Sequence, residues 1–354
     1  MFHKILLKWY LENKRFLPWR ETSNPYYIWI SEIILQQTKI EQGLSYYEKF
    51  VSSFPEVENL ANADEETILK MWQGLGYYSR ARNLHFSAKY IVNELNSNFP
   101  NTYKEIIKLK GVGDYTASAI ASICFDEKTA VVDGNVYRVL ARYLGIYTPI
   151  NSTKGIKYFK EVAQSLLCKE NPGTYNQAIM DFGAIQCKPK NPLCDSCPFN
   201  DSCVALAENK ISVLPVKEKK TKISKKHFNY IIPINPKNQT IFEKRTSKGI
   251  WLNMYQFPLW ESKNEIFEDT FEPKSILENY NLTIDSVSLF NQEPIVHKLS
   301  HQHIYTKFWI LNTYDSNKNF QNWDEIHQYP VPILIHNFIK EFEQKRIFST
   351  FDTK

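Results

Sequence analysis

The chain has 354 residues, of which 43% are hydrophobic, 14% aromatic and 23% charged. These proportions are typical of a globular protein of two domains, and they exclude a disordered, collagenous or coiled-coil chain. The net charge of +5 permits binding to a polyanion but does not identify one. No uncharged apolar run approaches the roughly 20 residues that a membrane-spanning helix needs, and the N-terminal segment lacks the cleavage site of a secretory signal. We therefore expect a cytoplasmic protein with no membrane partner.

The first 207 residues have the apolar periodicity of helices. An amphipathic helix is predicted within residues 1–16, and apolar residues recur at spacings of three and four through 106–125 and 134–146. The helical segments are separated by prolines, at Pro25, Pro55, Pro100, Pro149 and Pro172. The pattern therefore predicts an all-helical N-terminal part.

One carboxylate of this part lies in apolar sequence. Glu32 has apolar neighbours on both sides, which are Trp29, Ile30, Ile33, Ile34 and Leu35. A carboxyl group buried among them would have a raised pKa and would be a proton donor at neutral pH. The alternative is an exposed glutamate on the polar stripe of a helix.

A pair of glycines stands before a helix of small residues. Gly111 and Gly113 let the backbone turn sharply, and the N–H groups at the start of the following helix can hold a phosphate. The alternative is a plain connection between two helices.

A second carboxylate stands at the entrance of the next helix. Asp133 follows two β-branched residues and precedes a helical run. Taken alone, it is a helix N-cap that satisfies free backbone N–H groups. It becomes a candidate catalytic group only in combination with the other motifs.

Four of the six cysteines fall in one short stretch, and the other two, Cys124 and Cys168, stand apart. The stretch holds Cys187, then Cys194 after six residues, Cys197 after two more and Cys203 after five more. Four thiolates on such a loop can surround one small inorganic centre, and sulfur suits either zinc or an iron–sulfur cluster. Either centre would be structural, because four thiolates leave zinc no open position for catalysis.

The pattern changes after the cysteine loop. Residues 208–227 form a basic linker, whose lysines are Lys217, Lys219, Lys220, Lys222, Lys225 and Lys226. This linker is either a solvated tether or a strap near nucleic-acid phosphates. Strand-like runs follow at 229–234, 239–245, 254–260 and 303–311, and a helix is predicted at 330–346. The C-terminal part is therefore predicted to be α+β.

The chain carries, in order, the motifs LPWR, SEIILQQT, GLGYYSRARNLH, GVGDYTASAI, VDGNVYRVLAR and the cysteine loop. In this order they closely resemble the MutY family of adenine DNA glycosylases, which belongs to the helix-hairpin-helix superfamily that also contains endonuclease III. The resemblance is dense over residues 1–207, and the cysteine spacing matches the family's [4Fe–4S] loop. Residues 244–258 and 297–303 more weakly resemble the family's MutT-like domain.

The resemblance implies a multidomain fold. An all-α helix-hairpin-helix glycosylase domain with a four-cysteine iron–sulfur loop would be followed by an α+β Nudix-like (MutT-like) domain. The helical domain would cover 1–207 in two lobes with DNA between them, the hairpin lying at about 107–124 and the iron–sulfur loop at 187–203. The basic linker would cover 208–227, and the MutT-like 8-oxoguanine recognition domain 228–346.

The resemblance also implies an activity in base excision repair. A monofunctional enzyme of this kind hydrolyses the N-glycosidic bond of adenine mispaired with 8-oxoguanine or guanine in duplex DNA, after flipping the nucleotide out of the stack. Glu32 matches the general acid that protonates adenine N7. Asp133 matches the carboxylate that stabilises the oxocarbenium-like sugar, in a division of roles known from glycoside hydrolysis.

Further positions match functional residues of the family. Tyr115 and Asn135 match residues that line the catalytic site. The matches to the adenine pocket are Trp19, Arg20, Leu35 and Gln177. The matches to DNA-contacting residues are Gln37, Thr38, Tyr77, Gly111 and Gly113. Ser300 and His301 match the loop that reads 8-oxoguanine.

The resemblance implies one [4Fe–4S] cluster held by the four cysteines, a monovalent cation at the hairpin, and no nucleotide cofactor. Its partner would be duplex DNA containing the mispair, bound by a monomer. Leu299 stands where the family usually has phenylalanine in the reading loop, which leaves the preference between 8-oxoguanine and guanine open. The MutT-like part lacks the REx₂EE carboxylates of Nudix hydrolases, so we expect it to bind rather than hydrolyse.

Two rival functions have to be weighed against this one. A bifunctional endonuclease III-like glycosylase/lyase, acting on oxidised pyrimidines, needs an amine nucleophile. That relative has a lysine where this chain has Tyr115. A non-catalytic DNA-binding module is disfavoured because both carboxylates, Glu32 and Asp133, are present.

Overall fold

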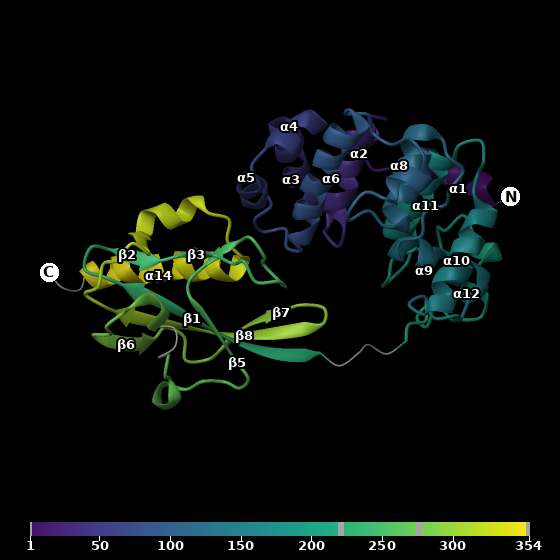
Figure 1. The fold of residues 1–354 in the computed structure, drawn as a ribbon. Coiled ribbons are helices and arrows are strands. Elements are labelled where there is room, and N and C mark those ends of the chain that lie inside the picture. Colours follow the sequence, from purple (N-terminus) through teal and green to yellow (C-terminus); the bar gives the residue numbers. More distant parts are fainter. Residues whose placement is uncertain (1, 219–222, 274–277, 352–354) are drawn as a thin grey trace. The chain divides into compact units, whose positions relative to one another are not determined.

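The computed structural model describes residues 2–218, 223–273 and 278–351 of the chain. The chain divides into two compact units (Figure 1). The helical unit comprises Met1–Ala63 and Arg82–Lys219, and the sheet unit comprises Asp64–Ala81 and Lys220–Lys354. No helix of the described residues is long and apolar enough to cross a membrane.

The helical unit has the predicted all-α fold. Its helices up to the hairpin are α1 (Phe2–Asn13), η1 (Pro18–Arg20), α2 (Pro25–Leu35), α3 (Ile40–Ser53), α4 (Val57–Asn62), α6 (Ser79–Leu95, which begins in the sheet unit) and α7 (Tyr103–Ile106). The helices after it are α8 (Asp114–Phe125), α9 (Gly134–Leu144), α10 (Thr153–Leu166), α11 (Pro172–Asp181), η2 (Phe182–Gln186), η3 (Asn200–Ser202) and α12 (Val204–Ala207). The predicted hairpin is therefore the turn between α7 and α8.

Local signals fix the ends of the two helices that carry the predicted carboxylates. The Asn24 side chain accepts a hydrogen bond from the Tyr26 N–H, so α2 begins at Pro25. At its other end, α9 stops at Gly145, whose backbone is left-handed with φ 66°. A Cβ at Gly145 would lie 2.5 Å from Val204 Cγ1, so glycine also allows α12 to approach α9.

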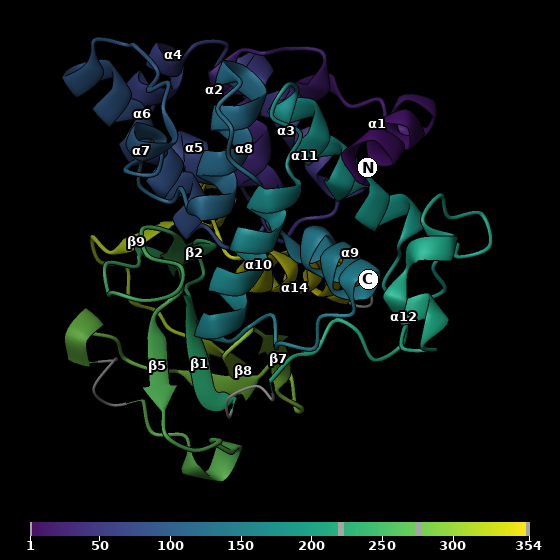
Figure 2. The same ribbon diagram turned by 90° about the vertical axis from the view of Figure 1, so that its right-hand side faces the viewer.

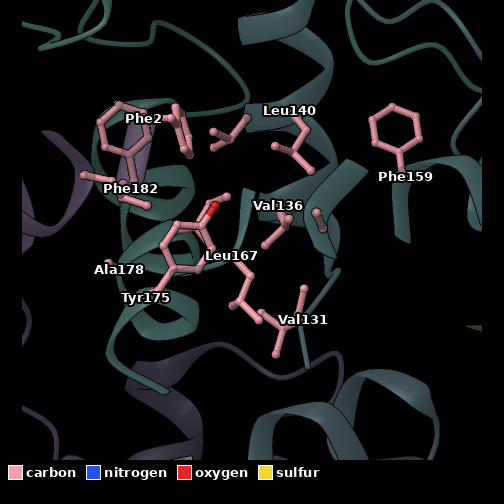
Figure 3. Close-up of a cluster of buried hydrophobic side chains, with 14 of the residues drawn as sticks. Phe2, Val131, Val136, Leu140, Phe159, Leu167, Tyr175, Ala178 and Phe182 are labelled. Atoms are coloured by element: carbon pink, nitrogen blue, oxygen red, sulfur yellow. The ribbon is translucent and has the colours of Figure 1, made fainter. Parts of the chain in front are cut away.

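The core of the helical unit surrounds α9. Val136 and Leu140 of α9 pack with Tyr175 of α11, with Phe182, and with Phe2 of α1 (Figure 3). α9 also contacts α10 and α12 (Figure 2). This packing fixes both ends of α9, of which the first carries Asp133 and the last approaches the cysteine loop.

The sheet unit is built on two long parallel strands. β1 (Ser224–Ile234) pairs with β8 (Gln302–Asn312) in the register Ser224↔Gln302 to Ile234↔Asn312. The main sheet has the order β6-β8-β1-β2-β9, with β5 pairing β1 and β7 pairing β8 in antiparallel fashion. The shorter strands are β2 (Gln239–Ile241), β5 (Leu259–Ser262), β6 (Ser286–Leu289), β7 (Ile295–Lys298) and β9 (Phe320–Asn322). A separate hairpin pairs β3 (Glu243–Lys244) with β4 (Tyr255–Gln256).

The C-terminal helix covers this sheet. Phe338 of α14 (Ile333–Phe351) stacks on Phe308 of β8, with ring centroids 4.1 Å apart. The helix begins later than the predicted residue 330 because Pro330 and Pro332 precede it. The remaining helices of the unit are α5 (Glu65–Met71), η4 (Glu268–Thr270) and η5 (Trp323–Gln328). The unit thus has the predicted α+β character.

The segment 64–81 differs from the predicted domain division, in which residues 1–207 form one domain. It groups with the sheet unit because its polar side chains find partners there. Glu66 of α5 accepts from Lys244 Nζ at 2.8 Å and from the Tyr255 hydroxyl at 3.0 Å. Lys70 Nζ donates to the carbonyl of Tyr329 at 3.0 Å. The sheet unit is therefore assembled from two separate stretches of chain.

The predicted linker, 208–227, is also shorter in the structure. Leu214 is only 2% exposed and belongs to the core of the helical unit. The Val216 carbonyl accepts from the Ile150 N–H at 3.0 Å. The sheet begins at Ser224, and Lys226 pairs with Glu261 at 3.4 Å. Lys219, Lys220 and Lys222 lie outside the described residues.

Candidate active site and cluster loop

A cavity of about 1250 Å³ opens in the helical unit. It gathers side chains from four separate parts of the sequence: the stretch from Arg15 to α3, the start of α8, the start of α9, and the stretch from the end of α11 to Pro189. Most of the residues predicted for the site line it, namely Trp19, Arg20, Glu32, Leu35, Gln37, Thr38, Tyr115, Asp133 and Asn135. Gln177 is not among the lining residues; its amide oxygen accepts from the Tyr10 hydroxyl at 2.9 Å.

The carboxyl of Glu32 has a pKa near neutrality, so a large fraction of it is protonated at neutral pH. Burial raises the pKa of Glu32 to about 7, and the neighbouring Asp133 carboxylate acts in the same direction. A hydrogen bond from the Tyr115 hydroxyl and the charge of Arg20 oppose this shift. Burial also raises the pKa of Tyr115 well above its usual value, so its hydroxyl remains a donor. Glu32 therefore meets the requirement for a general acid near neutral pH.

Asp133 is both a helix cap and a wall of the cavity. Its Oδ1 accepts from the Asn135 N–H at 2.9 Å and the Val136 N–H at 2.8 Å, and its Oδ2 accepts from Asn135 Nδ2 at 2.7 Å. Burial raises the pKa of Asp133, while these donors lower it. Hydrogen bonds to the charged form and the helix N-terminus favour the anion. Of the two carboxylates, Asp133 is thus suited to carry the charge and Glu32 the proton.

Arg138 joins this corner of the cavity to the cysteine loop. Its Nη2 donates to Asn135 Oδ1 at 2.8 Å and to the Gly183 carbonyl at 2.7 Å. Its Nε donates to the Cys187 carbonyl at 2.7 Å. Arg138 was not predicted, because only the folded chain brings Cys187 to α9.

A buried carboxylate that the sequence analysis missed holds Arg20 in place. Asp181 is fully buried, and its two oxygens accept from Arg20 Nη1 at 2.6 Å and Nη2 at 2.8 Å. Arg15 also forms an ion pair with it. Burial raises the pKa of Asp181, but the hydrogen bonds and charges of Arg20 and Arg15 outweigh this and lower it. The Arg20 guanidinium is therefore fixed at the cavity wall by a bidentate ion pair.

The predicted DNA-contacting residues occupy special backbone positions. Gln37 and Tyr77 are left-handed, with φ 57° and 48°, a conformation that non-glycine residues rarely adopt outside turns and functional sites. Gly111 has φ 85°, and a Cβ there would lie 2.8 Å from Asn83 Cβ, so this position requires glycine. Gly113 precedes α8 with nothing within 4 Å of an added Cβ, so the backbone there is open.

The predicted 8-oxoguanine-reading residues lie in the sheet unit. Ser300 and His301 form the turn between β7 and β8, which the Leu299 N–H closes by donating to the Gln302 carbonyl at 2.9 Å. The Ser300 hydroxyl lies 3.0 Å from the Tyr77 hydroxyl. Within the sheet unit, Tyr77, which is predicted to contact DNA, thus lies beside Ser300, which is predicted to recognise 8-oxoguanine.

The four clustered cysteines surround one pocket. Cys187, Cys194, Cys197 and Cys203 all line it, and the other described lining residues include no histidine and no carboxylate. Burial raises the pKa of Cys197 to about 11 and that of Cys194 and Cys203 in the same direction. Binding to a metal centre would supply the positive charge that such thiolates need. The donor set therefore fits an all-thiolate centre.

Gly183 allows the close approach between η2 and α9. A Cβ there would lie 2.6 Å from Asn135 Cβ and 2.9 Å from its backbone oxygen. We expect Gly183→Ala to lower the free energy of unfolding by about 1–3 kcal/mol, because the packed backbone has to shift. Urea titration followed by circular dichroism measures this change. Gly134→Ala is the control, since nothing lies within 4 Å of a Cβ at that position. Equal stabilities of the two variants would contradict the prediction.

Three segments of the chain match known families. Residues 30–163 match the family of HhH-GPD superfamily base excision DNA repair proteins. Residues 187–203 match the iron-sulfur binding domain of endonuclease III, and residues 229–341 match the NUDIX domain. The cysteine loop is therefore an iron–sulfur binding segment.

Similar proteins have been described in bacteria and animals. The adenine DNA glycosylase of Buchnera aphidicola subsp. Baizongia pistaciae is 36% identical over 313 residues, which cover 88% of this chain and 86% of the relative. The adenine DNA glycosylase of Homo sapiens is 42% identical over 213 residues, 58% of this chain and 39% of the relative.

Two solved structures resemble the helical part. A thermostable thymine-DNA glycosylase superposes with a TM-score of 0.55 and 31% identity, over 58% of this chain and 95% of its own. A non-covalent endonuclease III–DNA complex gives a TM-score of 0.51 at 20% identity, over 58% of this chain and 94% of its own, a likeness of fold.

Proposed function

The chain belongs to the adenine DNA glycosylase family, and we propose that it removes adenine mispaired with 8-oxoguanine or guanine from duplex DNA. This proposal rests on a pair of carboxylates that share one cavity and differ in their hydrogen-bond partners. Glu32 has a pKa near neutrality, and Asp133 has backbone and amide donors that favour its anion. Acid-assisted glycoside hydrolysis requires two carboxyl groups, one that donates a proton and one that stays ionised.

The proposed reaction is hydrolysis of one C–N bond. A flipped adenosine enters the cavity, and Glu32 transfers its proton to adenine N7, which makes the base a good leaving group. The Asp133 carboxylate stabilises the positive charge that develops on the sugar. Water then adds to the sugar with help from the deprotonated Glu32, so the products are free adenine and an abasic site.

Neighbouring side chains orient the reacting groups. The Tyr115 hydroxyl lowers the pKa of Glu32 and donates to Met180 Sδ at 3.2 Å, and Asn135 donates to Asp133. We assign Trp19, Arg20 and Leu35 to the adenine pocket because they line the same cavity, and we propose Gln177, which accepts from the Tyr10 hydroxyl, as a further residue of that pocket. The fixed guanidinium of Arg20 offers planar donors to a base edge.

We propose hydrolysis rather than lyase chemistry. The residue that enters the cavity from the start of α8 is Tyr115, a buried phenol with a strongly raised pKa and therefore no nucleophile at neutral pH. Lys39 also lines the cavity, so it is the amine that any strand cleavage would implicate.

We propose that the iron–sulfur centre is one [4Fe–4S] cluster with Cys187, Cys194, Cys197 and Cys203 as ligands. All four line one pocket, and residues 187–203 match the iron-sulfur binding domain of endonuclease III. An iron–sulfur cluster takes an all-thiolate donor set of this kind. When bound, the cluster supplies structure: it ties residues 187–203 into one loop.

The proposed DNA contacts come from both units. The hairpin at Gly111 and Gly113 would hold a backbone phosphate, together with a monovalent cation. Gln37, Thr38 and Tyr77 would contact the duplex, and Ser300 and His301 would read 8-oxoguanine. We propose that the protein acts as a monomer.

The deciding experiment is a single-turnover assay on duplexes with adenine opposite 8-oxoguanine, adenine opposite guanine, and thymine glycol opposite adenine. Products are scored with and without alkali, which cleaves abasic sites. Adenine release that needs alkali to reveal a nick is the expected result. Nicking of the thymine glycol strand without alkali would establish the lyase instead, and tight binding without release would establish a non-catalytic module.

Replacing Asp133 with asparagine is expected to slow adenine release by about 100- to 1000-fold, since the charge facing the sugar is lost. Asparagine is also a good N-cap, so α9 and the stability of the protein should be retained. Single-turnover rates and urea titrations test both parts. Asp324→Asn, at the exposed start of η5, is a control for the substitution itself. A normal rate for the Asp133 variant would contradict the assigned role.

A further inference from the structure

Arg142 is a buried cation at the C-terminal end of α9. The residue is only 3% exposed to solvent. The guanidinium Nη1 donates to Cys187 Sγ at 3.4 Å and to the Lys188 carbonyl at 2.8 Å. Nη2 donates to the Pro189 carbonyl at 3.2 Å, and Nε donates to the Leu214 carbonyl at 3.1 Å. One side chain therefore holds the chain on both sides of the cysteine loop.

The acceptors of Arg142 are unusual for a buried charge. They are three neutral carbonyls and one cysteine sulfur, and no carboxylate forms an ion pair with Arg142 in the described ranges. Burial of a cation without a counter-charge is costly. By contrast, the Arg20 guanidinium at the wall of the active-site cavity faces the Asp181 carboxylate. The negative charge that Arg142 requires has to come from another group.

The thiolate ligands supply such a charge. Four thiolates carry more negative charge than an oxidised [4Fe–4S] core neutralises, so the bound centre is an anion. Arg142 lines the same pocket as the four cysteines, and its Nη1 points at one of the sulfurs. The geometry points to Arg142 as the positioning residue of the cluster loop, which balances the charge of the cluster and hydrogen-bonds to its Cys187 ligand. This inference rests on the proposed cofactor.

The same side chain couples the cluster to the segment that follows the loop. Leu214, whose carbonyl accepts from Arg142, is buried in the core of the helical unit. Cys203 Sγ also lies 3.5 Å from the Arg142 carbonyl oxygen, so the residue contacts the first and the last cysteine. Loss of the cluster would leave Arg142 without a counter-charge and would loosen residues 187–189 and 214 together.

The test compares Arg142→Gln and Arg142→Lys in the full-length protein, purified with its cluster. Replacing a residue that hydrogen-bonds to a metal ligand typically lowers the affinity for the metal 10- to 100-fold. We expect iron release to a chelator, followed at about 400 nm, to be roughly 10- to 100-fold faster in Arg142→Gln. Arg142→Lys keeps the charge and should lie nearer the wild type. The exposed Lys210→Gln variant removes a nearby positive charge without touching the sulfurs, and should release iron at the wild-type rate.

A second measurement, the midpoint potential of the cluster, distinguishes a role of Arg142 in charge balance from a role in packing alone. Removing a positive charge and an N–H···S bond disfavours the reduced cluster, so the midpoint potential of Arg142→Gln should be lower than that of the wild type. Unchanged potential in the clusters that remain, or iron release at the wild-type rate, would overturn the proposal. If Arg142→Gln does not fold, the Arg142→Lys protein decides: it keeps the charge but loses the fork of donors to Cys187, Lys188, Pro189 and Leu214, so faster iron release with a potential close to that of the wild type is expected, and iron release at the wild-type rate would overturn the proposal. Iron content of the wild type tests the proposed cofactor separately, because it does not depend on Arg142.

Discussion

Replacing Glu32 with glutamine is expected to slow adenine release by about 100- to 10,000-fold, the usual contribution of a general acid. The amide keeps the size of the carboxyl group but has no proton to transfer. Binding of the duplex should be nearly unchanged, because Glu32 sits inside the cavity and faces Tyr115 and Asp133 rather than the hairpin. Single-turnover kinetics and anisotropy of a labelled duplex measure the two quantities. A variant with normal turnover would rule out Glu32 as the acid.

The pH profile supplies the matching control. The wild-type rate in the bound complex should fall as the pH rises through the pKa of about 7, because Glu32 then loses the proton that it has to donate. The residual rate of the Glu32→Gln variant should not fall over this pH range. A profile of the same shape in both proteins would assign the fall to another group.

The same raised pKa affects stability. The folded state binds the Glu32 proton more tightly than the unfolded chain, whose carboxyl has the ordinary value of 4.5. This contribution is fully present below 4.5 and is lost as the pH rises through about 7, a loss on the order of 3 kcal/mol. The glutamine variant does not titrate, so its stability relative to the wild type should increase over that interval.

Replacing Asp181 with asparagine is expected to lower the free energy of unfolding by about 3–5 kcal/mol, as for other broken buried ion pairs. The amide has nearly the same shape, but it leaves Arg20, whose side chain is only 10% exposed, without its counter-charge. Adenine release should slow as well, because Arg20 would no longer be fixed at the cavity wall.

Urea titration at neutral pH measures this loss. Asp114→Asn is the matched control: it removes a carboxylate that is 48% exposed from its ion pair with Lys160, and exposed pairs contribute about 0–1 kcal/mol. Arg20 and Arg15 lower the pKa of Asp181. The stability it provides is thus present above its ordinary value and lost as the pH falls through the lowered one. The difference in free energy of unfolding between the wild type and Asp181→Asn should therefore disappear at acid pH. A difference that persists there would mean that the variant is destabilised by its shape and not by the lost charge.

Local signals made much of the fold predictable. Proline and asparagine mark the start of α2, and Asp133 caps α9 while a glycine ends it. The helical and α+β parts follow from periodicity, since buried faces repeat every three or four residues in a helix and every two in a strand. These properties belong to single elements, so the sequence displays them directly.

What the sequence does not display is long-range partnership. Asp181 stands in a helical segment, where a single acidic residue is usually exposed to solvent. Its partner Arg20 lies 161 residues away in the sequence. Arg138 and Arg142 have the spacing of one turn on a helix, and only the return of the cysteine loop gives them acceptors. The segment 64–81 is likewise attached to the sheet unit by side chains such as Glu66, whose partner Lys244 is 178 residues away.

That discontinuous arrangement has a consequence for dissecting the protein. The chain passes between the two units three times, at about residues 63–64, 81–82 and 219–220, so neither unit is a single segment. One cut in the linker would separate residues 64–81 from the rest of the sheet unit. A fragment ending at 218 would retain residues 64–81 but lack Lys244, Tyr255 and Tyr329, on which their polar side chains depend. Circular permutants or fusions therefore need breakpoints that keep this insertion with its sheet.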